Sequence, residues 1–173
     1  MGQLAHLVDD LLEVSRISTG RIRLQQENVD MRGIVARAVE SIRPLIHQRR
    51  HKLTVKQSPE PIWLHGDPVR LEQVVTNLLA NAAKYTSESG EIWVTLQLEG
   101  NEAVLSVKDS GVGIASDLLP RIFDLFTQAV RSLDRSQGGL GIGLTLVQRL
   151  VEMHGGKVNA SSQLGVGSEF LVR

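Results

Sequence analysis

Glycine is concentrated in a few short segments of this chain, and that concentration constrains its fold more than any other feature. The 173 residues include 16 Gly, whereas aromatic residues make up only 3%. The densest segment is 138–144, which runs directly into a helical pattern of apolar residues at 145–154. Glycines in this position allow backbone N–H groups to surround an anion at the positive end of the helix dipole. The segment predicts a phosphate-binding loop, with a flexible hinge as the alternative.

A second glycine-containing segment follows the apolar strand pattern of residues 103–107. Asp109 comes two residues after this strand and is followed by Gly111 and Gly113. A carboxylate held at a strand end by a glycine turn can accept a hydrogen bond from a ligand amine, because the backbone there can approach closely. An Asx turn without a ligand is the alternative interpretation.

The predicted helix 68–85 carries polar residues that a solvated helix face rarely has. It begins with Asp67 as its cap and a proline at its first position. Asn77, Asn81 and Lys84 follow one stripe at helical spacing, beside a continuous apolar stripe. Asparagine inside a helix costs helix propensity, so we expect a compensating role. Amide oxygens on adjacent turns suit Mg²⁺ and a lysine suits phosphate, whereas surface or capping roles are the alternative.

The order of the patterns predicts an α+β fold, a sandwich with strands on one side and helices on the other. Helical patterns cover residues 4–14, 31–50, 68–85, 118–126 and 141–154. Strand patterns cover residues 52–56, 62–64, 92–98, 103–107, 157–160 and 168–172. We expect the first two strands to form a hairpin across residues 58–61, and Pro44 to kink or end the second helix.

Composition excludes several classes of protein. The chain has no Cys, which excludes disulfides, thiolate metal sites and thiol nucleophiles. Lys+Arg and Asp+Glu both total 19, so the net charge gives no reason to expect a nucleic acid or an anionic membrane as a partner. No apolar run approaches the about 18 residues of a membrane span, and we expect a cytoplasmic chain without direct membrane contact. The histidines lack metal-ligand spacing, and we expect surface or boundary positions for His6, His47, His51, His65 and His154.

At these motifs the chain closely resembles the catalytic and ATP-binding domain of bacterial sensor histidine kinases, within the gyrase and heat-shock-chaperone ATPase superfamily. Residues 77–86 resemble the N box of that family, and residues 109–114 resemble its first glycine box. Residues 122–126 resemble the F box, residues 139–144 the second glycine box and residues 165–170 a terminal glycine box. The resemblance implies a Bergerat-type ATP fold, in which a mixed, mostly antiparallel sheet packs on about three helices.

The resemblance also implies a role for each motif in holding ATP and Mg²⁺. Asp109 is expected to accept a hydrogen bond from the adenine amino group, and Asn81 to bind Mg²⁺ with Asn77 near it. Asn81, Lys84 and Arg131 are the expected catalytic residues. The expected nucleotide-binding residues are Asn77, Asn81, Lys84, Tyr85, Asp109, Gly111, Gly113, Ile114, Phe126, Gly139, Leu140, Gly141, Ile142, Gly143, Leu144 and Ser168.

A polar stretch without periodicity covers residues 127–140. The resemblance implies that this stretch is the mobile ATP lid of the domain. Arg131 and Arg135 fit a role in reaching the phosphates, although arginine in a polar loop is usually solvated.

The N-terminal helix resembles the second helix of the family's dimerisation and phosphoacceptor hairpin. We expect residues 1–26 to hold this partial hairpin and a linker, and residues 27–173 to form the catalytic ATP-binding domain. In the family, the phosphorylated His lies on the first helix and is followed by an acid and shortly by a proline. None of the five histidines has this context, so we expect the phosphoacceptor helix to lie outside this chain and the parent protein to be a homodimer.

The function implied by the resemblance is that of a protein-histidine kinase of a two-component system. Such a kinase transfers the γ-phosphoryl group of Mg-ATP to a His, from which it passes to an Asp on a response-regulator receiver domain. An ATP hydrolase of the same superfamily and a nucleotide-sensing module without phosphotransfer are the alternatives. Hydrolytic members place a water-activating Glu one turn before the metal-binding Asn, where this chain has Asn77, and this difference favours phosphotransfer.

Overall fold

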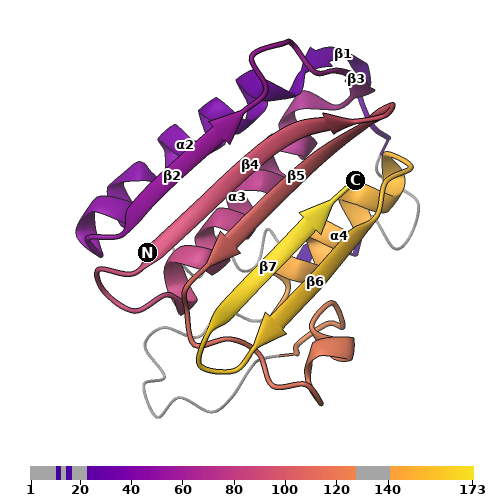
Figure 1. The fold of residues 1–173 in the computed structure, drawn as a ribbon. Coiled ribbons are helices and arrows are strands. Elements are labelled where there is room, and N and C mark those ends of the chain that lie inside the picture. Colours follow the sequence, from indigo (N-terminus) through magenta and orange to yellow (C-terminus); the bar gives the residue numbers. More distant parts are fainter. Residues whose placement is uncertain (1–10, 13–14, 17–22, 128–140) are drawn as a thin grey trace.

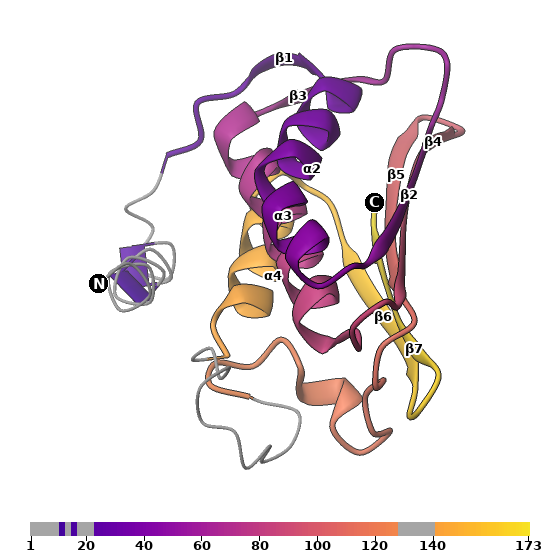
Figure 2. The same ribbon diagram turned by 90° about the vertical axis from the view of Figure 1, so that its left-hand side faces the viewer.

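Within the described residues, three helices cover one face of a five-stranded sheet and leave its other face open (Figures 1 and 2). The computed structural model describes residues 11–12, 15–16, 23–127 and 141–173. The helices are α2 (Met31–Gln48), α3 (Pro68–Tyr85) and α4 (Gly143–Met153). This arrangement confirms the predicted α+β sandwich. Most of the predicted N-terminal helix lies outside the described residues.

The sheet is mixed and mostly antiparallel, as expected. Its strand order is β2-β4-β5-β7-β6, in which β2 and β4 are parallel and the other neighbours are antiparallel. The strands are β2 (Lys52–Gln57), β4 (Glu91–Glu99), β5 (Glu102–Asp109), β6 (Val158–Gln163) and β7 (Gly167–Val172). Alternate residues face the helices, so Ile92, Val94 and Leu96 of β4 are buried in the core.

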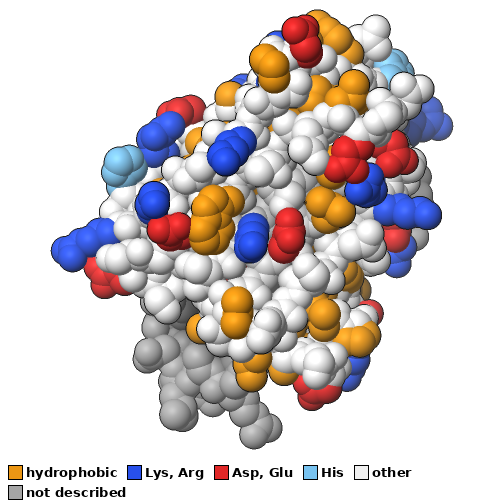
Figure 3. Space-filling model, viewed as in Figure 1, with side chains coloured by type: hydrophobic (Ala, Val, Ile, Leu, Met, Phe, Trp, Pro, Cys, Tyr) orange, Lys and Arg blue, Asp and Glu red, His pale blue; other side chains and the backbone are white. Residues whose placement is uncertain are grey.

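The open face of the sheet carries charged side chains of both signs, interspersed with hydrophobic ones (Figure 3). Lys108 Nζ lies 5.9 Å from the centroid of the Trp93 ring. Ser106 Oγ donates a hydrogen bond to Glu169 Oε1 at 2.7 Å. Each of these contacts joins a charged side chain to an uncharged one on the neighbouring strand, and the charges of both signs are mixed over this face (Figure 3).

Helix α3 begins where its sequence predicts. Oδ1 of Asp67 accepts hydrogen bonds from the N–H groups of Val69 and Arg70 at 3.0 and 3.2 Å, and Pro68 occupies the first turn. Burying a large aliphatic side chain contributes roughly 1.5–3 kcal/mol relative to exposing it, so the apolar stripe fixes how the helix is rotated. The buried residues of α3 are Leu71, Val74, Val75, Leu78, Leu79, Ala82 and Ala83.

The start of α3 also joins two segments that are distant in sequence. Oδ2 of Asp67 accepts a hydrogen bond from the N–H of Gln25 at 2.9 Å. The N–H of Asp67 donates to Nε2 of His154 at 3.0 Å. Nδ1 of His154 lies 2.7 Å from the carbonyl oxygen of Leu150, so the hydrogen of this imidazole ring is assigned to Nδ1. The segment before β1 (Glu27–Asp30), the start of α3 and the end of α4 are therefore held together.

The predicted hairpin between the first two strand patterns is wrong. β2 pairs with β4 in the main sheet. β3 (Trp63–Gly66) instead pairs antiparallel with β1 (Glu27–Asp30), a strand that the sequence did not reveal, in a separate two-stranded sheet.

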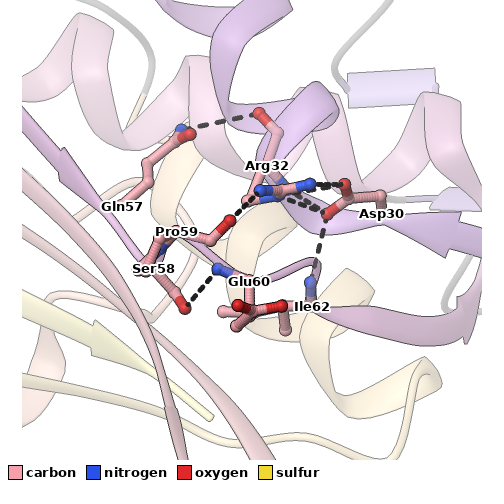
Figure 4. Close-up of polar contacts among 7 residues, drawn as sticks. All are labelled: Asp30, Arg32, Gln57, Ser58, Pro59, Glu60 and Ile62. Atoms are coloured by element: carbon pink, nitrogen blue, oxygen red, sulfur yellow. Dashed lines mark hydrogen bonds and ion pairs between the residues drawn. The ribbon is translucent and has the colours of Figure 1, made fainter.

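Polar contacts at the start of α2 explain this separation (Figure 4). Oδ1 of Asp30 accepts a hydrogen bond from the N–H of Ile62 at 3.2 Å. The Arg32 guanidinium binds both carboxylate oxygens of Asp30 and donates to the carbonyl oxygen of Pro59 at 2.6 Å. The hydrogen bond from Arg32 is the main cause that lowers the pKa of Asp30. These contacts hold the connection from β2 against the start of α2, so β3 leaves toward β1.

Two predicted helix boundaries near the glycine segments are also wrong. Residues 118–126 do not form a helix, because only the single 3₁₀ turn Leu119–Arg121 is present and Phe126 has a left-handed φ of 64°. α4 begins at Gly143 rather than at residue 141, since the φ of Gly141 is 71°. The left-handed backbone excludes Phe126 and Gly141 themselves from a helix.

One histidine differs from the expected surface or boundary position. His51 is buried, with 7% of its surface exposed. Its Nε2 lies 3.1 Å from the carbonyl oxygen of Ser87 and 3.3 Å from that of Thr86, so it supports the turn that follows α3. Separately, no helix in the described ranges combines the length and the apolar character that crossing a membrane requires.

Candidate nucleotide-binding site

The predicted motifs come together at one end of the sandwich, the lower end in Figures 1 and 2. The C-terminal end of α3, the end of β5, the turn between β6 and β7 and the start of α4 all lie there. Elements separated by up to about half of the chain therefore share this region, as the sequence motifs predicted.

Asp109 is the last residue of β5, and its side chain is 5% exposed. Its Oδ1 accepts a hydrogen bond from the N–H of Gly111 at 2.8 Å, so the Asx turn that the sequence offered as the alternative interpretation is present. Burial raises the pKa of this carboxyl group above its usual value, although the N–H groups of Gly111 and Ser168 act in the opposite direction. A buried carboxylate is costly unless it is paired, so Asp109 is well suited to accept hydrogen bonds from a ligand amino group.

The glycines after Asp109 allow close backbone packing. A Cβ atom at Gly111 would overlap the carbonyl oxygen of Tyr85, and one at Gly113 would overlap the carbonyl oxygen of Gln163. Gly113 also has a left-handed φ of 71°. Val112 between them donates its N–H to the Tyr85 carbonyl oxygen at 3.1 Å. The loop is thus fixed between the end of α3 and the end of β6.

The polar face of α3 carries the residues predicted to bind the metal ion and the phosphates. Asn77 and Asn81 are half-buried and lie one turn apart. Nδ2 of Asn77 is buried and has no hydrogen-bond partner within the described part of the chain. Lys84 Nζ lies 4.8 Å from the centroid of the Tyr85 ring, in a cation–π contact.

The start of α4 approaches this face of α3. The position that a Cβ atom of Gly143 would take lies 3.8 Å from Oδ1 of Asn77. Ile142 is 2% exposed, so its side chain belongs to the core and only its backbone is available to a ligand. Leu144 is partly buried and packs against the same core. The N–H groups of the first turn of α4 therefore lie beside the polar face of α3, as an anion site requires.

Gly141 is placed by the residues of the predicted F box. The N–H of Phe126 donates to the carbonyl oxygen of Gly141 at 3.2 Å. Phe126 itself is 58% exposed. Four residues predicted to act at the site lie outside the described residues, and they are Arg131, Arg135, Gly139 and Leu140.

The sequence did not reveal the contacts of Ser162, which lies on β6 beside these segments. Its Oγ accepts a hydrogen bond from the N–H of Ile114 at 2.7 Å and donates to the carbonyl oxygen of Gly167 at 2.8 Å. It also lies 3.0 Å from Oγ of Ser168. A serine in an alternating strand carries no signal of such contacts, because they depend on two other segments of the chain.

Asn77 and Asn81 fit a hard divalent cation that is bound together with a phosphate. The unpartnered amide position of Asn77 is a buried polar group without compensation, which is typical of a ligand site. The oxygen and nitrogen of a side-chain amide exchange places on rotation, so either can face a ligand. Neutral amide oxygens suit Mg²⁺, which keeps most of its other ligands as water and phosphate oxygens.

Comparison with known proteins decides the family. The sequence profile described as "Histidine kinase-, DNA gyrase B-, and HSP90-like ATPase" matches residues 66–173, which is more than half of the chain. The chain belongs to this ATPase family. The matched range contains α3, β4 to β7 and α4, and hence the elements of the candidate site.

Curated relatives of this ATPase domain are sensor kinases that match nearly the whole chain. Sensor protein GacS of Pseudomonas syringae pv. syringae is 34% identical over 175 residues, which cover 98% of this chain and 19% of GacS. Sensor histidine kinase RcsC of Escherichia coli (strain K12) is 32% identical over 171 residues, which cover 98% of this chain and 18% of RcsC. The chain thus spans less than a fifth of the length of these relatives and corresponds to their ATP-binding catalytic domain.

Solved structures of histidine kinases share the fold. Full-length ShkA in complex with AMPPNP superposes with a TM-score of 0.84 at 33% identity, covering 98% of this chain and 35% of ShkA. Acinetobacter baumannii histidine kinase AdeS superposes with a TM-score of 0.79 at 25% identity, covering 98% of this chain and 76% of AdeS. The predicted kinase-type ATP fold is confirmed.

Proposed function

We propose that this ATPase domain binds Mg-ATP and transfers its γ-phosphoryl group to a histidine on a phosphoacceptor helix outside the chain. The phosphoryl group then passes to an aspartate on a response-regulator receiver domain. The parent protein is a homodimeric kinase whose N-terminal hairpin provides the phosphoacceptor. Relatives named as sensor kinases and the AMPPNP complex of ShkA support this function.

The buried carboxylate of Asp109 is the observation that carries the proposal. It lies 5% exposed at the end of a core strand, with its pKa raised by burial. An ionised carboxylate accepts hydrogen bonds, so it can bind a base whose amino group faces it. It disfavours a base whose carbonyl oxygen faces it, because two acceptors cannot share a hydrogen bond. Adenine presents an amino group and guanine presents a carbonyl oxygen at the corresponding position. Asp109 thus selects adenine nucleotides.

The other end of the pocket holds the triphosphate. Asn77 and Asn81 would hold Mg²⁺, which supplies charge neutralisation for the phosphates when it is bound. Lys84 and the N–H groups at the start of α4 stabilise the negative charge of the phosphates. These groups orient the γ-phosphoryl group and need not change their protonation state during the reaction.

The transfer itself is an in-line displacement at the γ-phosphorus. A bond forms between a nitrogen of the acceptor imidazole and phosphorus, while the bond from phosphorus to the β–γ bridging oxygen breaks. ADP leaves with the electron pair of that bond. The attacking nitrogen uses its lone pair and carries no proton, so the proton released to solvent comes from the other nitrogen of the imidazole ring. Hydrolysis would instead need a base that activates water, and the amide of Asn77 cannot accept a proton at neutral pH.

A three-way assay tests this function. The chain is mixed with γ-labelled ATP, Mg²⁺ and a separate sensor-kinase fragment that carries the phosphoacceptor helix. Acid-labile label on the fragment supports the kinase. Release of labelled phosphate without labelled fragment would show an ATPase, and saturable ATP binding with neither product would show a nucleotide sensor.

A matched pair of variants shows whether the label depends on the proposed site. Asn81→Ala removes the proposed metal ligand and should reduce transfer at least tenfold. Asn159→Ala removes an exposed amide from β6 and should transfer label at the wild-type rate. Equal transfer by both variants would contradict the placement of the metal ion on α3.

A further inference from the structure

Ser162 is the polar residue that joins the loop after Asp109 to the turn between β6 and β7. Its hydroxyl accepts a hydrogen bond from the N–H of Ile114 at 2.7 Å and donates one to the carbonyl oxygen of Gly167 at 2.8 Å. A serine hydroxyl has one hydrogen and two lone pairs. Because its hydrogen is used on Gly167, Ser162 must accept from Ser168, whose Oγ lies 3.0 Å away. All three hydrogen-bonding positions of Ser162 are then used.

This saturated hydroxyl joins two segments on either side of Asp109, where the adenine base is proposed to bind. Through Ile114 it holds the loop that contains Gly113, whose backbone packs against the end of β6. Through Ser168 it holds β7 next to Asp109, because the N–H of Ser168 donates to the Asp109 carboxylate. Ser168 is 8% exposed and pairs with Asp109 in the sheet register.

The contacts of Ser162 also set the direction of the Ser168 hydroxyl. The single hydrogen of Ser168 Oγ points at Ser162, so only its lone pairs remain for other partners. The Asp109 carboxylate is likewise an acceptor when it is ionised. The purine end of the pocket therefore presents acceptors from two neighbouring strands.

We propose that Ser162 is a positioning residue for ATP recognition, which holds the loop after Asp109 and the Ser168 hydroxyl in the arrangement that binds the adenine base. Ser162 acts through these groups and does not contact the phosphates. This role rests on the proposed function, since it needs ATP to be the ligand of the site.

Ligand titrations of the whole chain test the role. Ser162→Ala leaves the Ile114 N–H and the Gly167 carbonyl without their partner and frees the Ser168 hydroxyl to rotate. We expect the Kd for Mg-ATP to rise about tenfold, as for loss of one partly buried hydrogen-bonded group. The Kd for Mg-tripolyphosphate, which has no base and is measured by ³¹P NMR, should change less than about twofold, because one lost contact at the other end of the pocket leaves the phosphate groups in place.

Three further variants complete the test. Ser161→Ala is the matched control, because Ser161 is exposed on the opposite face of the same strand, and it should bind ATP as the wild type does. Ser162→Thr keeps the hydroxyl and suits a strand, so it should restore most of the affinity. Asp109→Asn should weaken ATP binding without affecting tripolyphosphate, which checks the assignment of the base site independently of Ser162.

The outcomes separate the two proposals. Wild-type affinity in Ser162→Ala, or an equal loss for ATP and tripolyphosphate, would overturn the role of Ser162. A wild-type chain that binds no ATP would overturn the proposed function and this role with it. Hydrogen exchange of the wild-type chain gives a measurement that needs no variant: the Ile114 amide should be protected, and rapid exchange would refute its bond to Ser162.

Discussion

Replacing Asp109 by Asn should separate binding of ATP from stability of the fold. The variant keeps the size of the side chain and one acceptor oxygen for the N–H of Gly111, which now lies 2.8 Å from Oδ1. It removes the charge of a group that is 5% exposed, and it replaces one acceptor oxygen by an NH₂ donor. That donor would face the amino group of adenine, which is also a donor.

The loss of affinity follows from the hydrogen bond that is removed. A hydrogen bond to a charged group contributes about 1.5–3 kcal/mol, which corresponds to a rise in Kd for ATP of about 10-fold to 150-fold. Isothermal titration calorimetry at pH 7 with Mg-ATP measures this change directly. An affinity within about twofold of wild type would refute the assignment of Asp109 to the base.

Without ligand, Asp109→Asn should not destabilise the fold, although it weakens ATP binding. Burial raises the pKa of Asp109 above the reference value of 3.8, so the native state binds this proton more tightly than the unfolded state does. Protonation of Asp109 therefore stabilises the fold, and this stabilisation is present below pH 3.8 and lost as the pH rises through the raised pKa. At pH 7 the ionised carboxylate is a cost that Asn does not have.

Urea unfolding at several pH values checks this reasoning. Asp109→Asn should be at least as stable as wild type at pH 7, and its advantage should shrink as the pH falls and wild-type Asp109 becomes neutral. A variant that is clearly less stable at pH 7 would show that the two N–H groups stabilise the carboxylate more than burial destabilises it. The calorimetric result would then reflect partial unfolding rather than loss of the base contact.

Substitutions of Gly113, Asp67 and Asp30 test the framework of the fold. In Gly113→Ala, strain of about 1–2 kcal/mol from the left-handed φ adds to overpacking of about 1–3 kcal/mol against β6, so both the stability of the fold and the affinity for ATP should fall. Gly100→Ala is the control, because Gly100 lies in an open turn at φ 60°. In urea unfolding it should lose only the stability that the strain accounts for. Asp67→Ala removes both the helix cap and the hydrogen bond from Gln25, so its free energy of unfolding should fall by about 2.5 kcal/mol. Asp67→Asn keeps the cap and loses only the bond from Gln25, so its free energy of unfolding should fall by about 1.5 kcal/mol. Equal losses in the two variants would contradict separate contributions from the cap and the bond. Asp30→Asn should be less stable than wild type at pH 7, and the difference should close as the pH falls through the lowered pKa of Asp30; a constant difference would contradict the ion pair.

Local signals in the sequence were sufficient for the long helix and the central strands. Asp67 and Pro68 mark the start of α3, and the apolar stripe after them gives its rotation, so its bounds agree with the prediction. β4 and β5 were also located, because strong alternation surrounds a short turn. The strand β5 extends two residues beyond its apolar pattern to Asp109, because the backbone of Asp109 still pairs with Ile92 of β4 and with Ser168 of β7.

The errors arose where contacts between distant segments determine the structure. Two strands close in sequence usually pair, but Asp30 and Arg32 hold the connection near Pro59 and separate β2 from β3. Sequence periodicity also gave no reason to select Ser162, since its partners come from other elements. Of the site, the sequence therefore predicted the groups proposed to contact the ligand and missed the one that we propose holds them in place.

The polar contacts of α3 explain why the site lies at its C-terminal end. At the N-terminal end, the Asp67 carboxylate accepts hydrogen bonds from three N–H groups, and its own N–H is bound by His154, so this end is fully anchored. Toward the other end, the described residues leave buried polar atoms without partners on Asn77, Thr86 and His51. Such atoms cost stability unless a ligand or water satisfies them. Asn77 lies beside the proposed phosphate end, so a ligand bound there would satisfy its amide. A ligand that binds the native state in this way should stabilise the fold.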